Sequence, residues 1–221
     1  IGAGGVHVAD DAYLPAARQV CRERGVLWVS DEVITGFGRL GEWFASTRFD
    51  LQPDLMLTAK GLTSGYVPMG AVVVAPSVAD PFWSRPGTVW RHGYTYSGHA
   101  VAAAAALANL DILEREGLVE RVRSLEPVLA DALEPLTGHP AVSEVRAGTG
   151  LVAAVQVDPQ RLADDPAVTS RVVQAMRESG VLTRALVDGS LQVSPPFVVE
   201  ESDLKHFAEV AADALDREAG R

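Results

Sequence analysis

The sequence predicts an α/β protein with a mostly parallel sheet, followed by a smaller α+β domain that begins near residue 120. Three short apolar runs, at 26–29, 55–58 and 71–75, are typical of strands, and a helical pattern at 12–24 precedes the first of them. Helices and short strands that alternate with brief connections indicate a parallel sheet, in which ligands bind at the carboxyl ends of the strands.

Each element of the first part has a local reason. Gly25 ends the helical pattern, and the unbroken apolar run at 26–29 predicts a strand buried on both faces. Pro76 stops the third strand, because proline cannot donate to a sheet ladder. From Ser97 the chain is rich in alanine, which predicts a strong helix that Gly117 interrupts.

The second part has a different order of elements, which favours an α+β domain. Gly148-Thr149-Gly150 is expected to form the turn of a hairpin, and Ser202 is a candidate N-cap for the last helix. The expected elements, in order, are an amphipathic helix at 118–136, hairpin strands at 142–145 and 151–157, a helix at 167–179, short strands at 181–184 and 191–194, and a helix at 202–218.

Composition excludes several classes of protein. The 221 residues carry a net charge of −10, and no basic patch is present, so we expect no nucleic-acid partner. Cys21 is the single cysteine, which fits a reducing, cytoplasmic setting. No apolar stretch reaches the roughly 20 residues of a membrane helix. The chain begins at Ile1 and enters directly on glycines, so we expect it to be a piece of a longer protein.

Lys60 is the most informative residue, because it follows an apolar strand and is followed at once by Gly61. Lysine is rarely buried unless it is paired or chemically used, and burial favours the neutral, nucleophilic amine. Taken alone, such a lysine is more often one whose ammonium reaches the surface. Asp31 follows the preceding strand, although an isolated carboxylate there is as often a helix cap or a satisfied core group.

Lysine and carboxylate together point to one kind of chemistry. Pyridoxal phosphate requires a lysine for its aldehyde and an acidic partner for its ring nitrogen. A neighbouring carboxylate keeps the pyridine nitrogen protonated, because an opposite charge favours the charged form. Asp31 and Lys60 both follow strands whose carboxyl ends we expect at one edge of the sheet.

Three segments, Asp31–Arg39, Lys60–Gly70 and His92–His99, resemble the class III aminotransferases, which are pyridoxal-phosphate enzymes of fold type I. The likeness spans essentially the whole chain and is closest to the omega-amino-acid:pyruvate type. It implies that residues 1–118 are the C-terminal portion of the cofactor-binding large domain, and that residues 119–221 are the small C-terminal α+β domain.

The resemblance also implies roles for single residues. Lys60 would bond to the cofactor aldehyde and then carry the proton during transfer, and Asp31 would pair with the ring nitrogen. Val33 would pack on one face of the ring, which is also what a core valine does. Thr95 would bind the cofactor phosphate of the neighbouring subunit, so a homodimer with composite active sites is expected. Without the resemblance, Thr95 would more often be only a residue at the start of a helix.

Three further residues are candidates for substrate binding. Arg184 stands where related omega-transaminases carry a mobile arginine for the substrate carboxylate, and its planar fork suits that group. The competing interpretation is a surface arginine. Tyr66 and Trp90 would line a substrate channel, although both can equally be half-buried aromatic residues. The histidines lack metal-ligand spacing, so no metal is predicted.

The predicted function is ping-pong transamination through pyridoxamine phosphate, from an amine or omega-amino acid to a keto acid such as pyruvate. The alternatives are an aminomutase or racemase with the same cofactor, or a truncated relative without catalytic activity. The resemblance implies (S)-amines. It also implies that groups of the other half of such enzymes complete the site, so this chain alone is expected to bind cofactor poorly.

Overall fold

The computed structural model describes residues 2–219, which form two compact units. One unit comprises residues 9–119, and we call it the lysine unit because it contains Lys60. The other combines the residues up to Val8 with those from Glu120 onward, and we call it the arginine unit because it contains Arg184. That the two units serve as parts of a large and a small domain stays a prediction.

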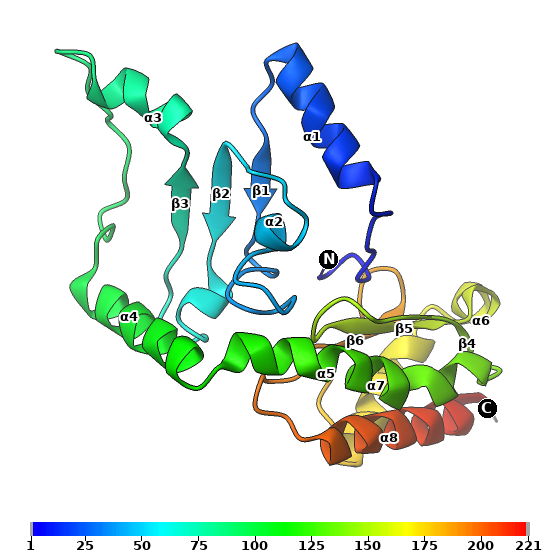
Figure 1. The fold of residues 1–221 in the computed structure, drawn as a ribbon. Coiled ribbons are helices and arrows are strands. Elements are labelled where there is room, and N and C mark those ends of the chain that lie inside the picture. The colour runs from blue at the N-terminus through cyan, green and yellow to red at the C-terminus, as the bar shows by residue number, and fades with distance from the viewer. Residues whose placement is uncertain (1, 220–221) are drawn as a thin grey trace. The chain divides into compact units, whose positions relative to one another are not determined.

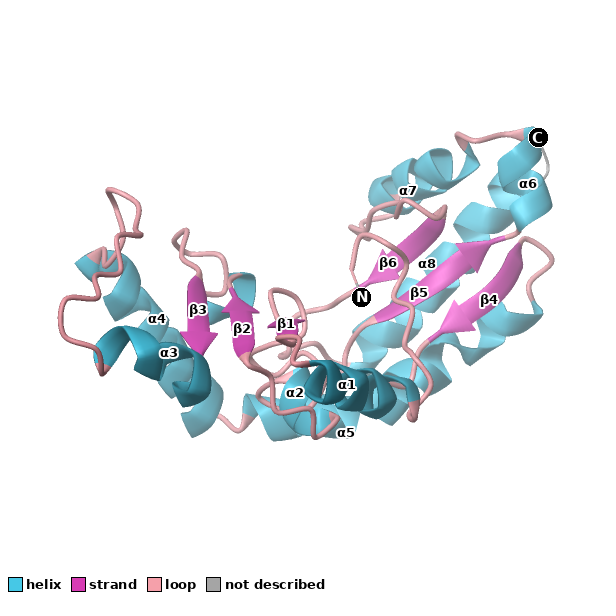
Figure 2. Cartoon of the chain, turned by 90° about the horizontal axis from the view of Figure 1, so that it is seen from above, coloured by secondary structure: helices cyan, strands magenta, loops and turns pink. Residues whose placement is uncertain are grey.

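The lysine unit is built on a three-stranded sheet in the order β1-β2-β3 (Figures 1 and 2). Strand β1 (Val29–Asp31) pairs in parallel with β2 (Leu55–Thr58), as the sequence predicts. Strand β3 (Ala71–Val74) instead runs antiparallel to β2. Residues 59–70 connect β2 to β3 through a short 3-10 turn and contain no crossover helix of the kind that joins parallel strands, so the chain returns antiparallel.

Helix α1 (Tyr13–Arg24) ends as expected at Gly25, which adopts a left-handed φ of 63°. The first strand begins three residues later than predicted, at Val29 rather than at Val26. Asp54 explains this shift, because its carboxylate Oδ2 accepts from the Trp28 amide at 2.7 Å and its amide donates to the Trp28 carbonyl at 3.0 Å. These bonds hold the residues before β1 outside the ladder.

Burial of the first sheet differs from the expectation. The apolar run at 26–29 predicts a strand covered on both faces, yet Val26 and Leu27 are each 55% exposed. Every residue of β3 is exposed as well. Within the described residues, therefore, the apolar faces of this sheet are largely uncovered.

Further helices complete the lysine unit. Helix α3 (Pro76–Trp83) was not anticipated from the sequence, and it places Pro76 in its first turn, where the missing N–H costs nothing. Helix α4 (Ala100–Arg115) begins after His99, whose ring accepts from the Ala102 amide at 3.3 Å. The two short elements are α2 (Ala45–Arg48) and the 3-10 turn η1 (Lys60–Leu62).

The arginine unit packs helices on one face of an antiparallel sheet in the order β4-β5-β6 (Figure 1). The hairpin of β4 (Val142–Arg146) and β5 (Ala153–Val157) forms where the sequence predicts it, with residues 148–150 in its loop. The remaining elements are α5 (Leu118–Leu133), η2 (Glu134–Gly138), α6 (Pro159–Asp164), α7 (Val168–Glu178), β6 (Ser190–Val193) and α8 (Glu201–Ala219).

A single core fills the space between this sheet and helices α5, α7 and α8. Leu129 of α5, Val155 of β5 and Met176 of α7 are completely buried in it. Alternation along β5 is absent, because all of its residues except Gln156 are buried. This unit therefore completes its own core.

Two expectations for the arginine unit are wrong. Residues 181–184 do not form a strand, and only an isolated bridge joins Ala185 to Leu191. Ser202 does not cap the last helix, because α8 already begins at Glu201. Instead Asp203, in the first turn, accepts from the Glu200 amide at 3.2 Å.

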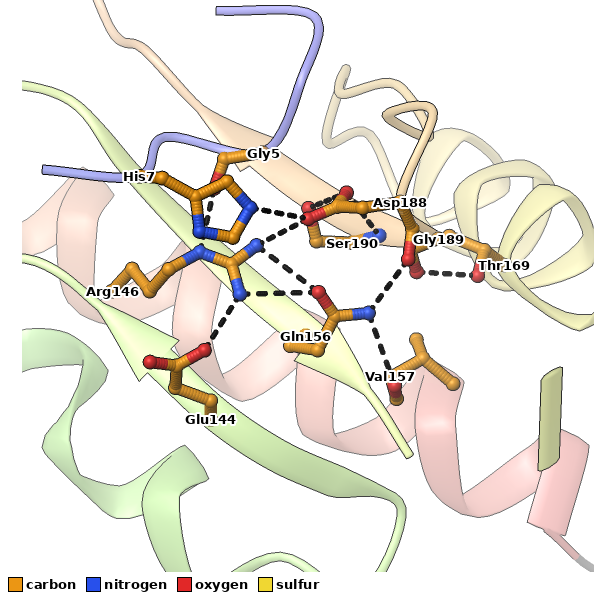
Figure 3. A network of polar contacts seen from close by, with 10 residues as sticks. All are labelled: Gly5, His7, Glu144, Arg146, Gln156, Val157, Thr169, Asp188, Gly189 and Ser190. Carbon is orange, nitrogen blue, oxygen red and sulfur yellow. Dashed lines mark hydrogen bonds and ion pairs between the residues drawn. The ribbon is translucent and has the colours of Figure 1, made fainter. Parts of the chain in front are cut away.

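The residues up to Val8 belong to the arginine unit, although the sequence places them with residues 9–118. Arg146 explains this, because its Nε donates to the Gly5 carbonyl at 2.6 Å (Figure 3). Gly5 adopts a φ of +114°, and a Cβ there would clash with the Asp188 carboxylate. None of the helices in residues 2–219 is both long and apolar enough to cross a membrane.

Candidate functional site

Asp31 and Lys60 lie at the same edge of the first sheet. Asp31 is the last residue of β1 and pairs in register with Leu57 of the parallel strand β2, three positions before Lys60. Both side chains are exposed, so Lys60 is not the buried lysine that the sequence suggests. The reason is that the strand ends open onto an edge that other described residues do not cover.

The backbone of Lys60 is strained. Its φ is +37°, a left-handed value that costs a residue with a side chain roughly 1–2 kcal/mol. The turn is closed by bonds from the Leu62 amide to the Ala59 carbonyl at 2.9 Å and from the Thr63 amide to the Lys60 carbonyl at 3.2 Å. Strain of this kind persists only where the surroundings enforce it, and it is concentrated at functional sites.

Gly61 brings the lysine turn against the loop that follows Asp31. A Cβ at Gly61 would lie 3.1 Å from the Cβ of Phe37 and 3.3 Å from the carbonyl oxygen of Gly36. Only glycine allows this close approach without displacing Phe37. Two of the three motifs that stand apart in the sequence are therefore in contact in the structure.

Asn109 of α4 fastens the lysine turn from the other side. Its Nδ2 donates to the carbonyls of Gly61 at 2.8 Å and Leu62 at 3.2 Å, and its Oδ1 accepts from the Ser64 hydroxyl at 2.6 Å. Asn109 was missed in the sequence. The available signal was a polar amide in an otherwise alanine- and leucine-rich helix.

Glu32 is the buried anchor of the Asp31 loop, with 1% of its surface exposed. Its carboxylate accepts from the amides of Ala45 at 2.9 Å and Ser46 at 2.7 Å. It also accepts from the hydroxyls of Ser30 and Thr35. Sequence reasoning assigned no role to Glu32, because an Asp-Glu pair does not reveal which carboxylate points inward.

Asp31 keeps its carboxylate at the sheet edge by a local bond. Its Oδ1 accepts from the amide of Val33 at 3.1 Å, which forms an Asx-type turn immediately after β1. Val33 itself is half-buried. The turn fixes the direction of one carboxylate oxygen, so that the Asp31 side chain is pre-positioned for a partner.

Arg39 ends the same motif and is largely enclosed by protein. Burial lowers the pKa of its guanidinium from 12.5 to about 10, since desolvation penalises the charged form. Arg39 therefore remains a cation at neutral pH.

Thr95 lies in an exposed turn ahead of α4. The turn is closed by two bonds of 2.9 Å, from the Tyr94 amide to the Ser97 hydroxyl and from the Ser97 amide to the Tyr94 carbonyl. The Thr95 side chain is therefore presented outward. Its role toward a phosphate stays a prediction.

Tyr66 and Trp90 are also exposed, by 87% and 56% respectively. Trp90 lies within an aromatic row, with ring centroids 5.2 Å from Phe82 and 5.8 Å from His92. No ring contact of Tyr66 is recorded among the described residues. Because both side chains are exposed, neither is the half-buried aromatic residue of the alternative interpretation.

Arg184 belongs to the arginine unit, in the segment that pairs with β6. Its Nε donates to the Oε1 of Gln192, and its carbonyl accepts from the Gln192 amide at 3.1 Å. Arg184 and Gln192 line a hollow of about 640 Å³, together with residues such as Leu182, Ser194 and Pro196.

The arginine unit also contains a polar network centred on Arg146, whose side chain is only 9% exposed (Figure 3). Its Nη2 bonds to Asp188 Oδ2 at 2.6 Å and its Nη1 to Glu144 Oε2 at 2.7 Å. Burial by itself raises the pKa of Asp188. The hydrogen bonds from Ser190 and the charge of Arg146 lower it by more than burial raises it, so the pKa lies below the usual value. This network joins the segment around Gly5 to the loop before β6.

The residues at the first sheet edge fit two ends of a pyridoxal phosphate molecule. Lys60 provides a primary amine for an aldehyde, and Asp31 provides a carboxylate with a fixed direction for a protonated ring nitrogen. The strained turn and the contact at Gly61 hold the two loops that carry these groups. Nowhere in residues 2–219 do three or more His, Cys, Asp or Glu side chains gather as metal ligands would.

Fold and site together define an α/β chain that presents lysine and aspartate at parallel strand ends. Residues 1–215 match the model of the family described as aminotransferase class-III. The chain belongs to this family.

Similar proteins carry related names. Over 99% of the chain, the sequence is 41% identical to a putrescine–pyruvate aminotransferase of Pseudomonas aeruginosa, of which it covers 48%. It is 36% identical to an omega-amino acid–pyruvate aminotransferase of Pseudomonas putida, covering 98% of the chain and 48% of that protein. The chain thus spans about half the length of these curated relatives.

Solved structures agree with the fold. An (S)-enantioselective omega-transaminase from Thermomicrobium roseum matches 98% of the chain and 49% of its own, with a TM-score of 0.91 and 39% identity. A transaminase from a marine Virgibacillus matches 99% and 51%, with a TM-score of 0.91 and 34% identity. These matches confirm the fold class that the resemblance implied.

Proposed function

We propose that the intact protein is a pyridoxal-phosphate-dependent transaminase that moves an amino group from an amine or omega-amino acid to a keto acid such as pyruvate. The observation that carries the proposal is the placement of Lys60 and Asp31 at one edge of parallel strands, in a chain of the class-III family. Similarity to the putrescine–pyruvate enzyme favours a diamine or another carboxylate-free amine as donor.

Pyridoxal phosphate, when bound, supplies an aldehyde that captures the amine and a ring that accepts the electrons of a broken Cα–H bond. Lys60 Nζ would hold the aldehyde, and its free amine would carry the proton between the substrate Cα and the cofactor. Asp31 would keep a proton on the ring nitrogen, because its negative charge favours the protonated pyridine. Val33 would pack against the ring.

Thr95 binds phosphate through its exposed hydroxyl, in the active site of a second subunit. The exposure of Thr95 in the turn ahead of α4 supports this proposal. A role in the second subunit's site implies a homodimer with composite active sites. Tyr66 and Trp90 line the path of the substrate, which their exposure supports. A cytoplasmic location is proposed from the single cysteine.

Arg184 binds the carboxylate of the keto acid through its guanidinium fork. Its side chain is exposed, and its one recorded side-chain hydrogen bond within the described residues goes to the neutral amide of Gln192, so its positive charge stays available. The same arginine turns away when a carboxylate-free amine occupies the site.

The test is alanine formation from pyruvate by the intact protein loaded with pyridoxal phosphate, with putrescine as donor. Parallel double-reciprocal lines are expected, because the donor product leaves before pyruvate binds. Lys60→Ala should lower kcat by at least about 10³-fold, since it removes both the amine and the proton carrier. Lys205→Ala, which changes the other lysine of the sequence, should leave the rate unchanged.

Retained activity in Lys60→Ala, or equal losses in both lysine variants, would contradict the proposal. Absence of any amine-dependent alanine formation, with a panel of amines and omega-amino acids as donors, would overturn the assigned reaction.

A further inference from the structure

Gln192 is the side-chain partner that the structure records for Arg184. The Nε of Arg184 donates to the Oε1 of Gln192. No ion pair of Arg184 with a carboxylate is recorded in the part of the chain that the structure describes. The contact uses Nε, and within the described residues no hydrogen bond from the two terminal guanidinium nitrogens is recorded.

Gln192 is rigidly placed. It lies within β6 and pairs with Ala154 of the central strand β5. Its neighbours Leu191 and Val193 are buried in the core. The amide is oriented as well, because its Nε2 donates to the Ser194 hydroxyl at 3.1 Å and its oxygen therefore faces Arg184.

Arg184 is held much less firmly than Gln192. It precedes the isolated bridge between Ala185 and Leu191 and belongs to no regular strand. Its side chain is exposed and borders the hollow of about 640 Å³, which leaves room for the arm to turn. An exposed cation thus lies beside a fixed neutral acceptor.

The chemistry of this acceptor matters. A carboxylate in its place would form a charged, two-bond pair with the guanidinium fork and would compete with any carboxylate substrate. An amide oxygen carries no net charge and accepts through a weaker bond. It therefore orients the arginine without neutralising it.

We infer that Gln192 is a positioning residue for carboxylate recognition: it holds Arg184 by Nε, leaves the terminal fork for the keto acid, and releases the arm for amines without a carboxylate. This inference rests on the proposed transaminase function. It assigns substrate selectivity to a side chain that does not itself touch the substrate.

The experiment compares Gln192→Glu and Gln192→Ala in the intact, cofactor-loaded protein, with pyruvate as acceptor and putrescine as donor. Gln192→Glu should raise the KM for pyruvate about tenfold, because the new carboxylate occupies the arginine. Gln192→Ala should raise it about threefold, through loss of orientation alone. The KM for putrescine and kcat should stay within about twofold in both variants.

Gln160→Glu is the matched control, because it makes the same change on α6, at an exposed glutamine of the same unit. It should alter neither KM. Equal losses toward pyruvate and putrescine in the Gln192 variants would indicate a merely structural effect and would overturn the inference.

Arg184→Ala separates this inference from the proposed function. If Arg184→Ala leaves the KM for pyruvate unchanged, the proposed role of Arg184 fails, and the inference about Gln192 fails with it. If Arg184→Ala raises that KM and Gln192→Glu does not, only the inference about Gln192 is overturned. When Gln192→Glu is combined with Arg184→Ala, it should raise the KM for pyruvate no further, because Gln192 acts only through Arg184.

A second readout is independent of turnover. The Nε–H of Arg184 should exchange with solvent at least about threefold faster in Gln192→Ala than in the parent protein, by nitrogen-15 NMR, because its acceptor is gone. An unchanged exchange rate would show that the hydrogen bond is not formed in solution and would overturn the inference.

Discussion

The two units differ in how far each completes its own core, although both are built on three-stranded sheets. Val73 in β3 of the lysine unit is 55% exposed, whereas Val155 in β5 of the arginine unit is completely buried. The lysine unit carries the proposed chemical groups, Lys60 and Asp31, on a sheet that the described residues leave open. The arginine unit carries Arg184, the proposed carboxylate-binding residue, beside a sheet that is buried against its own helices. The proposed reacting groups therefore lie in the unit with the less complete core.

The lysine unit compensates locally for its open sheet with polar anchors. Glu32 collects four hydrogen bonds beneath the Asp31 loop, and Asn109 fastens the Lys60 turn. The arginine unit relies instead on burial, with one polar network around Arg146. The stability of the lysine unit should therefore depend most on its buried polar side chains, and that of the arginine unit on its buried apolar ones.

The largest expected effect is that of Glu32→Ala, which should cost the lysine unit about 3 kcal/mol, because buried amides of α2 and two hydroxyls lose their acceptor. All four tryptophans lie in residues 9–119, so urea unfolding followed by tryptophan fluorescence reports on this unit. Glu23→Ala, an exposed glutamate of α1, is the control and should cost less than about 0.5 kcal/mol. Equal costs would remove Glu32 as an anchor.

A matched pair of valine substitutions tests the difference in burial between the two sheets. In the 221-residue chain, Val155→Ala should cost the arginine unit about 2 kcal/mol, through lost burial and a cavity. Val73→Ala should cost the lysine unit less than about 0.5 kcal/mol, because the side chain is already exposed. Amide hydrogen exchange, resolved by peptide, measures both. Equal costs would mean that the face of β3 is packed in solution.

Asn109→Ala should have a smaller effect on the lysine unit, of about 1 kcal/mol. The lost bonds to Gly61, Leu62 and Ser64 are partly offset by the better helix propensity of alanine. Asn109→Asp should behave similarly, because it keeps an acceptor for Ser64 but loses both donors. Urea unfolding followed by tryptophan fluorescence is again the measurement. An unchanged free energy of unfolding in Asn109→Ala would show that the turn at Lys60 does not need these hydrogen bonds.

An effect of similar size depends on pH. The folded-state pKa of Asp188 is lowered below its unfolded value of 3.8, so its contribution to stability is present above that value and is lost as the pH falls through the folded pKa. Asp188→Asn should therefore lower the stability of the arginine unit at pH 7 by about 1 kcal/mol, and the difference from the parent should disappear as the pH falls through the folded-state pKa of Asp188. A difference that grows toward low pH, in urea titrations followed by circular dichroism, would contradict this sign.

Much of the fold follows from local pattern. The strand at Leu55–Thr58, the helix ended by Gly25 and the hairpin around Gly148–Gly150 all form where apolar period and turn residues place them. The failures were tertiary in origin. Asp54 takes the backbone bonds that would have extended β1 toward Val26, and the segment before Arg184 finds a partner only at one bridge.

For the site, the pairing of a lysine and a carboxylate after neighbouring strands, together with the family resemblance of the surrounding motifs, indicated Lys60 and Asp31. Their supports were not visible in this way. Glu32 and Asn109 act through backbone amides and carbonyls distant in sequence, and Gln192 acts through a single contact across a turn. Such roles depend on which way a side chain points, which period and composition do not encode.

Borohydride reduction of the intact protein with pyridoxal phosphate, followed by peptide mass mapping, tests the central claim most directly. The sequence contains two lysines, so the exposed Lys205 of α8 serves as an internal control for Lys60. The account predicts a phosphopyridoxyl label on Lys60 and none on Lys205, with the Lys60 label lost when putrescine is added before reduction. A label on Lys205 alone, or no label on either lysine, would contradict it.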